Sequence, residues 1–222
     1  MKKSLIAIFL VTVMTLPLFS ADKGTKEINI KAGLNINPSA TVDIDGIVSG
    51  IDAELPFSLD GGVVADGNMQ YRLGAEGYYF VKDGLGVGLG VERAFPTGYI
   101  NEILARADSV NIYAAVKQEI KISENKFIDG IYLLGRLGYG INNLKSDLSK
   151  ILSKTEGINL DVSADNGLYW ALGMGVEKNN FLIEILYSVN YSKLNVDIKE
   201  INISTDLSLS TIGINVGYKF TI

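Results

Sequence analysis

The last twelve residues, Thr211–Ile222, read TIGINVGYKFTI. Every second residue is large and apolar, and the residues between them are small or polar. Strict alternation of this kind puts the two sets of side chains on opposite faces of a β-strand. Because chain termini are usually disordered unless the fold holds them, the stretch predicts a final strand that is paired along its length.

The same alternation recurs in seven earlier segments of about ten residues each, a length and period typical of strands. Together with the C-terminal stretch these segments predict eight strands, at 27–36, 70–80, 84–92, 109–122, 130–141, 167–177, 181–192 and 211–222.

The expected connections alternate between short and long. Short polar turns separate the second strand from the third, the fourth from the fifth and the sixth from the seventh. The other connections cover roughly 37–67, 95–107, 142–166 and 193–208, with the usual error of a few residues at each boundary. Short turns at one end and long loops at the other are typical of an antiparallel up-and-down transmembrane β-barrel of the outer membrane. The alternation persists through 195–210, so the final hairpin could also rise beyond the membrane.

A soluble β-sandwich or a lipocalin-like barrel is the competing fold. Either would need a plainly polar face opposite the apolar one, but here that face is rich in glycine and alanine, as in 84–90 and 171–175. Small residues weaken a solvent-exposed strand, whereas they suit the crowded interior of an eight-stranded barrel. The pattern therefore favours an all-β, eight-stranded transmembrane barrel with its apolar stripes facing lipid.

Isolated charged residues lie among the small residues of the inner face. We expect them to pair across the lumen, because an unpaired buried charge costs several kcal/mol. The alternation puts the first group in the middle and upper barrel and the second in the lower part: Lys31, Arg72, Glu76, Glu92, Lys117 and Arg136; then Glu119, Glu177, Glu184 and Lys219. Such a network could be structural filling or a polar conduit, and the narrow bore of eight strands favours filling.

Aromatic residues near the strand ends suggest two girdles at the membrane interfaces. The expected girdle by the short turns contains Tyr78, Tyr79, Phe80, Phe127, Phe181 and Phe220, and the one toward the loops contains Phe95, Tyr139 and Tyr191.

The N-terminal residues 1–21 have the layout of a secretory signal peptide: Lys2 and Lys3, an apolar run, and small residues before a charged segment. The run is short for a helix that needs about 20 residues to cross a membrane. This leaves 22–222 as the barrel domain. The cleavage point is open, since Leu18 or Phe19 would stand where a small residue is preferred.

Composition excludes several classes of function. The chain has no cysteine, which excludes disulfides and thiolate metal sites, and its formal net charge of -5 does not suit a nucleic-acid partner.

The signal peptide, the eight alternating segments and the VGYKF ending resemble the small outer-membrane barrels of the OmpA, OmpX and opacity-protein kind. The resemblance implies a Gram-negative outer membrane as the location, membrane lipid as the surroundings, and the barrel-assembly machinery as a partner. In that group the machinery recognises alternating hydrophobics in the last strand with a terminal aromatic, which here corresponds to Tyr218, Phe220 and Ile222. The aliphatic Ile222 departs from the usual terminal aromatic.

No enzyme chemistry is expected. The barrel enzymes of this membrane use a histidine, and this chain has none. The acid pairs Asp43 with Asp45 and Glu76 with Glu92 are interpreted as loop or lumen residues, and no cofactor is expected. The main functional hypothesis is a structural or surface-interaction role through four long extracellular loops. Two alternatives remain: a narrow porin-like channel for small solutes, and an adhesin that binds host or matrix components through those loops.

Overall fold

The computed structural model describes residues 21–42, 63–66, 70–96, 106–121, 127–145, 160–198 and 201–222. The expected signal peptide up to residue 20 and the acid pair Asp43 and Asp45 lie outside these residues. Within the described ranges, no helix has the length and apolar character needed to cross a membrane.

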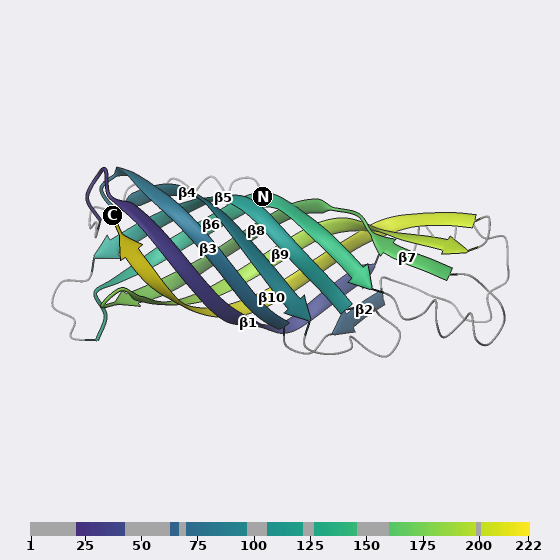
Figure 1. Cartoon of the computed structure of the whole chain (residues 1–222). Helices are drawn as coiled ribbons and strands as arrows, with labels where there is room; N and C mark the ends of the chain where they lie inside the picture. Colours follow the sequence, from purple (N-terminus) through teal and green to yellow (C-terminus); the bar gives the residue numbers. More distant parts are fainter. Residues whose placement is uncertain are drawn as a thin grey trace, which may run out of the picture.

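The described residues form ten antiparallel strands, and eight of these close into a barrel (Figure 1). Around the barrel the order is β10, β1, β3, β4, β5, β6, β8 and β9, and pairing of β9 with β10 completes the ring. The short strands β2 and β7 extend the sheet beside β1 and β9. The bounds are β1 Lys26–Val42, β2 Val63–Asp66, β3 Gln70–Lys82, β4 Leu85–Pro96, β5 Arg106–Lys121, β6 Gly130–Lys145, β7 Leu160–Ala164, β8 Gly167–Lys178, β9 Phe181–Ile198 and β10 Ile201–Thr221. The prediction of an eight-stranded barrel is confirmed.

The C-terminal stretch forms the seam of the barrel. Ile28 of β1 lies opposite Phe220 of β10, and the register continues without interruption as far as Ile36 opposite Ile212. The backbone N–H of Ile222 donates to the carbonyl oxygen of Lys26 at 2.9 Å. The terminal strand is therefore paired along its length, as its alternation predicts.

The outer face of the barrel carries the large apolar side chains. Ile30, Leu89 and Ile185, on three different strands, are 56, 73 and 53% exposed. The buried residues, by contrast, include more than twenty polar or charged side chains. This arrangement is the reverse of a soluble protein and fits a barrel whose outer face contacts lipid.

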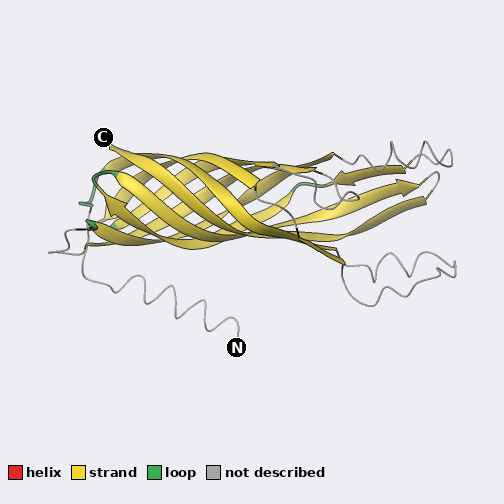
Figure 2. Ribbon diagram, turned by 90° about the horizontal axis from the view of Figure 1, so that it is seen from below, coloured by secondary structure: helices red, strands yellow, loops and turns green. Residues whose placement is uncertain are grey.

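The tight turns lie at the same end of the barrel as the C-terminus, here called the lower end (Figure 2). Gly84, with a φ of 68°, follows Asp83 in the turn between β3 and β4. Asn179 and Asn180 connect β8 to β9 with φ values of 48° and 69°, the left-handed conformation that two-residue hairpin turns favour.

The expected long loop at 193–208 is wrong. β9 runs to Ile198, β10 starts at Ile201, and these two residues lie opposite each other. The alternation that continues through 195–210 explains the extension, because it supports paired strands beyond the barrel wall. The expected loops 37–67 and 142–166 likewise contain the ends of β1 and β6, together with β2 and β7.

Deleting Phe220–Ile222 should impair assembly of the barrel. The deletion removes the pairing of Phe220 with Ile28 and the bond from Ile222 to Lys26, and closure is required in lipid. It also removes part of the expected assembly signal, whose Tyr218 and Phe220 rings meet edge to face on the outer face, with centroids 4.9 Å apart. We expect less protein in the membrane fraction and a loss of the heat-dependent gel shift. Thr221→Ala, which keeps the backbone pairing, is the control; a truncated chain that inserts as well as this control would refute the prediction.

Candidate functional site: the charged barrel interior

All ten charged residues expected in the lumen are buried. They come from all eight barrel strands and form two groups that differ in height and in charge balance. Glu27 is an eleventh buried charge. It occupies an inward position of the first alternating segment, so the alternation of that segment already indicates that Glu27 belongs to the interior.

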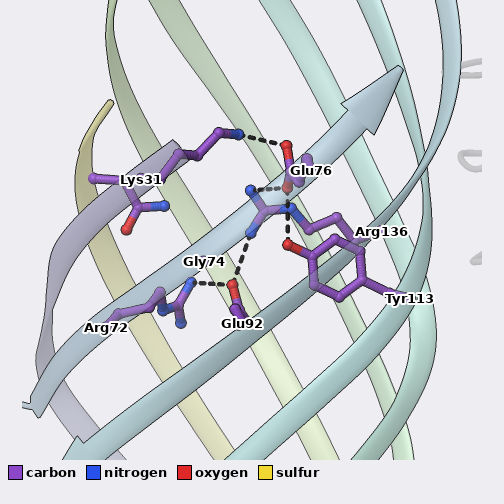
Figure 3. Close-up of a pocket in the computed structure, with 8 residues that line it drawn as sticks. Lys31, Arg72, Gly74, Glu76, Glu92, Tyr113 and Arg136 are labelled. Atoms are coloured by element: carbon purple, nitrogen blue, oxygen red, sulfur yellow. Dashed lines mark hydrogen bonds and ion pairs between the residues drawn. The ribbon is translucent and has the colours of Figure 1, made fainter. Parts of the chain in front are cut away.

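The central cluster, halfway along the barrel, contains three cations and three carboxylates. Its members are Lys31, Arg72, Glu76, Glu92, Arg136 and Glu184. Arg136 lies in the middle, with Nη2 at 2.6 Å from Oε1 of Glu76 and Nη1 at 3.0 Å from Oε2 of Glu92 (Figure 3). One guanidinium group thus bridges carboxylates of two neighbouring strands.

The remaining cations complete the central cluster. Lys31 Nζ lies 2.5 Å from Oε2 of Glu76 and also pairs with Glu184. Arg72 Nη1 is 3.5 Å from Oε2 of Glu92, and its Nη2 donates to the hydroxyl of Ser188 at 3.1 Å. Each carboxylate of the cluster therefore contacts at least two cations, and the formal charges of the six groups sum to zero.

Four buried tyrosines donate hydrogen bonds to the same carboxylates. The hydroxyls of Tyr78 and Tyr113 lie 2.8 and 2.9 Å from Glu76. Tyr132 donates to Glu184 at 3.0 Å and Tyr169 to Glu92 at 2.9 Å. Charge-assisted hydrogen bonds of this type are stronger than those between neutral groups, so the tyrosines help to satisfy carboxylate oxygens that are shut off from solvent.

The placement of Tyr78 and Phe80 in an outer girdle is wrong. Both side chains point into the barrel, where they are 4 and 0% exposed, whereas Tyr79 between them points outward. Both residues are an even number of positions from Glu76 on the same strand, so they share its inward-facing side. This alternation outweighs the preference of aromatic residues for the interface.

Glycines on the neighbouring strands make room for the tyrosine rings. A Cβ atom on Gly90 would lie 2.5 Å from the ring of Tyr113, and one on Gly175 would lie 2.3 Å from the ring of Tyr132. Real atoms do not approach so closely. The small residues of the inner face are thus the counterpart of the large buried rings opposite them.

The lower cluster lies near the tight turns and contains three carboxylates and two ammonium groups. Its members are Glu27, Lys117, Glu119, Glu177 and Lys219. Lys117 Nζ is 2.9 Å from Oε2 of Glu27 and also pairs with Glu119. Lys219 Nζ is 3.3 Å from Oε1 of Glu27 and also pairs with Glu177. The formal charges of this cluster sum to minus one.

Two expected heights are wrong. Lys117, expected in the middle or upper barrel, belongs to the lower cluster, and Glu184, expected in the lower part, belongs to the central cluster. Strands in a barrel are tilted and staggered, so counting residues from a strand end does not give the height at which side chains from different strands meet.

Uncharged amides form a layer above the central cluster. Asn190 Nδ2 donates to Oδ1 of Asn142 at 2.8 Å and to Oδ1 of Asn111 at 3.2 Å. Asn111 in turn donates to Glu92 at 3.1 Å, which joins the two layers. This layer was not predicted: Asn111 and Asn190 stand at inward positions of their segments, whereas Asn142 falls at the start of the expected loop 142–166.

Little free space remains at the central cluster. The cavity in Figure 3 is lined by central-cluster residues, and the volume open to the centre of a water molecule is about 10 Å³. This volume is about enough for a single water. In the described ranges, acidic side chains do not gather into a set able to hold a metal ion. Glu76 and Glu92, considered as an acid pair, are both occupied by Arg136 and by tyrosine hydroxyls.

Two ion pairs outside the lumen are exposed and serve as a contrast. Arg93 and Asp108 are joined at 2.6 and 3.1 Å on the outer face. In the lower turns, Asp129 accepts hydrogen bonds from the backbone N–H of Asn179 and from Lys178. These two bonds lower the pKa of Asp129, with the larger effect from Asn179. Exposed pairs contribute little to stability.

Eight closed strands with an apolar outer face and a charged, filled interior define an outer-membrane β-barrel of the Gram-negative type. Residues 6–220 match the family described as outer membrane protein beta-barrel domain, and the chain belongs to that family. The resemblance inferred from the sequence is thereby confirmed.

Individual relatives are more distant. OprG of Pseudomonas aeruginosa is 16% identical, with 92% of this chain and 99% of that chain covered and a TM-score of 0.49. Ail of Yersinia pestis is 14% identical, with 89 and 99% covered and a TM-score of 0.41. The uncharacterized protein PM1543 of Pasteurella multocida is 30% identical over 124 residues, which are 52% of this chain and 51% of that protein. The match therefore spans about half the length of this curated relative.

Arg136→Met should destabilise the barrel strongly. The substitution leaves Glu76, Glu92 and Glu184 in the interior without their shared cation, and breaking a buried ion pair by removing one partner costs about 3–5 kcal/mol. Reversible urea unfolding in phospholipid vesicles measures this change in the free energy of unfolding. Arg93→Met, at the exposed pair with Asp108, is the matched control and should change it little. Equal effects of the two substitutions would contradict the structural role proposed for the central cluster.

Proposed function

We propose that the protein is a closed, non-enzymatic barrel that anchors a set of extended strands at the outer surface of the membrane. The observation that carries the proposal is the filled interior. Two ion-paired clusters, four tyrosines and an amide layer occupy the lumen, and the central cavity has room for about one water molecule.

The charged network supports structural filling more than a conduit. A conducting path needs groups that an incoming solute can displace, but each carboxylate of the central cluster contacts two or more cations and also accepts a hydrogen bond from a tyrosine. Opening the lumen would separate several of these pairs at once, and each separation would cost several kcal/mol. The porin-like hypothesis therefore has less support than the closed barrel.

The strands at the upper end support a surface role. β9 and β10 stay paired up to Ile198 and Ile201, and β7 adds to the edge of β9 in the same region (Figure 1). β2 similarly pairs with the end of β1. Paired strands give the segments that join them a rigid base, and binding residues often lie on segments held by a rigid scaffold. Binding of a host or matrix component at this end stays a prediction.

Purified protein reconstituted in planar bilayers should show no channel openings above noise at neutral pH. The reason is that the lower cluster, the central cluster and the amide layer all occupy the lumen. A general porin added to the same bilayer is the positive control for detection. Reproducible single-channel steps from the folded, heat-modifiable protein would overturn the closed-barrel proposal and favour the channel.

A further inference from the structure

The first described residues, 21–25, fold against the lower mouth of the barrel. The backbone N–H of Gly24 donates to the carbonyl oxygen of Phe80 at 2.8 Å, and the N–H of Phe80 donates to Thr25 at 2.9 Å. Gly24 has a φ of 92°, a conformation that glycine adopts without strain. The chain can therefore turn at this residue and follow the hairpin between β3 and β4.

Ala21 is an integral part of this contact. Its carbonyl oxygen accepts a hydrogen bond of 2.7 Å from the N–H of Gly84, and its side chain packs against the apolar cluster of the interior that includes Phe80. The N–H of Lys23 donates to the carboxylate of Asp83 at 2.8 Å. Cleavage after Ala21 would remove both the hydrogen-bond acceptor and the packed methyl group from the mature protein.

The contact of Ala21 leads directly to the lower cluster. The carbonyl oxygen of Gly84 accepts hydrogen bonds from the backbone N–H of Glu119 at 2.7 Å and from Nε2 of Gln118 at 3.2 Å. Ala21, Gly84 and Glu119 are thus consecutive members of one hydrogen-bonded chain. Any charge placed on the amino group of Ala21 would act next to the lower cluster, in which three buried carboxylates face two lysines.

Glu119 is the carboxylate of the lower cluster with the least compensation. It is 98% buried, as its exposed fraction of 2% shows. Its Oε1 pairs with Lys117, which Glu27 shares, while its Oε2 accepts no hydrogen bond from the described residues. A buried carboxylate is costly when the cation beside it is shared with a second carboxylate. One more cation within the lower cluster would balance its three carboxylates.

We propose that the signal peptide is removed between Ser20 and Ala21, and that the α-ammonium group this creates on Ala21 is the third cation of the lower cluster. The cleavage is a hydrolysis: water breaks the C–N bond, its oxygen remains on the new carboxylate of Ser20, and the released amine of Ala21 binds a proton. The mature chain then begins one residue earlier than the 22–222 expected from the sequence. The cleavage also places Leu18, instead of the bulkier Phe19, where a small residue is preferred.

N-terminal sequencing and intact-mass measurement of the barrel purified from membranes test the first part of this proposal. The expected first residue is Ala21. A mature chain that starts at Asp22, or at any other residue, would overturn the proposal. This result does not depend on conductance, so it stands or falls separately from the closed-barrel function.

The charge on Ala21 is tested in barrels that start at this residue and are refolded in vesicles. Acetylation of the α-amino group keeps the packing of Ala21 but removes its charge, so it should lower the urea concentration at the unfolding midpoint. In Glu119→Gln, which removes the excess carboxylate, acetylation should shift the midpoint by less than half as much. Equal shifts in the two proteins would refute the role of Glu119. If Glu119→Gln does not fold, the test rests on the unsubstituted protein. An unfolding midpoint that acetylation leaves unchanged would then refute the proposal that the ammonium group of Ala21 is a cation of the lower cluster.

Discussion

The closure of backbone hydrogen bonds is the constraint on which the rest of this structure depends. No water is present in the hydrocarbon region to satisfy an open strand edge, so the sheet must return to its own first strand. The pairing of Ile28 with Phe220 and of Ile36 with Ile212 meets this demand at the seam. Closure with eight strands fixes a narrow bore, and the alternation of side chains then sends every second residue either to lipid or into that bore.

The narrow bore explains the composition of the interior. Large rings such as Tyr113 and Tyr132 fit only because glycines stand opposite them. Charged groups are tolerated only because partners from other strands reach them, as Arg136 reaches Glu76 and Glu92. The central cluster is balanced within itself. The lower cluster has one carboxylate more than its lysines, and it lies at the end where the N-terminal residues fold back onto the barrel.

Most of the fold could be predicted from the sequence, because the alternation of inward and outward side chains is a local property of a strand. It does not depend on where the ends of the strand are placed. The alternation also predicts correctly that residues such as Lys31 and Lys219 point into the barrel. It does not predict the height of a side chain along the barrel axis, which depends on strand tilt and stagger, so the expected heights of Lys117 and Glu184 are wrong. Tyr78 was misplaced because residue type was weighed above this alternation. The tall β9–β10 hairpin followed from alternation that continues past the expected boundary at 193.

The central claim is that ammonium groups inside the barrel are held in ion pairs away from exchanging water. Nitrogen-detected NMR of the ¹⁵N-lysine-labelled protein in lipid nanodiscs tests this claim most directly. We expect slowly exchanging ammonium signals for Lys31 and Lys117 at neutral pH, assigned by Lys→Arg substitution, while the exposed Lys121 exchanges too fast to be seen. Ammonium protons of Lys31 and Lys117 that exchange as fast as those of Lys121 would contradict the account.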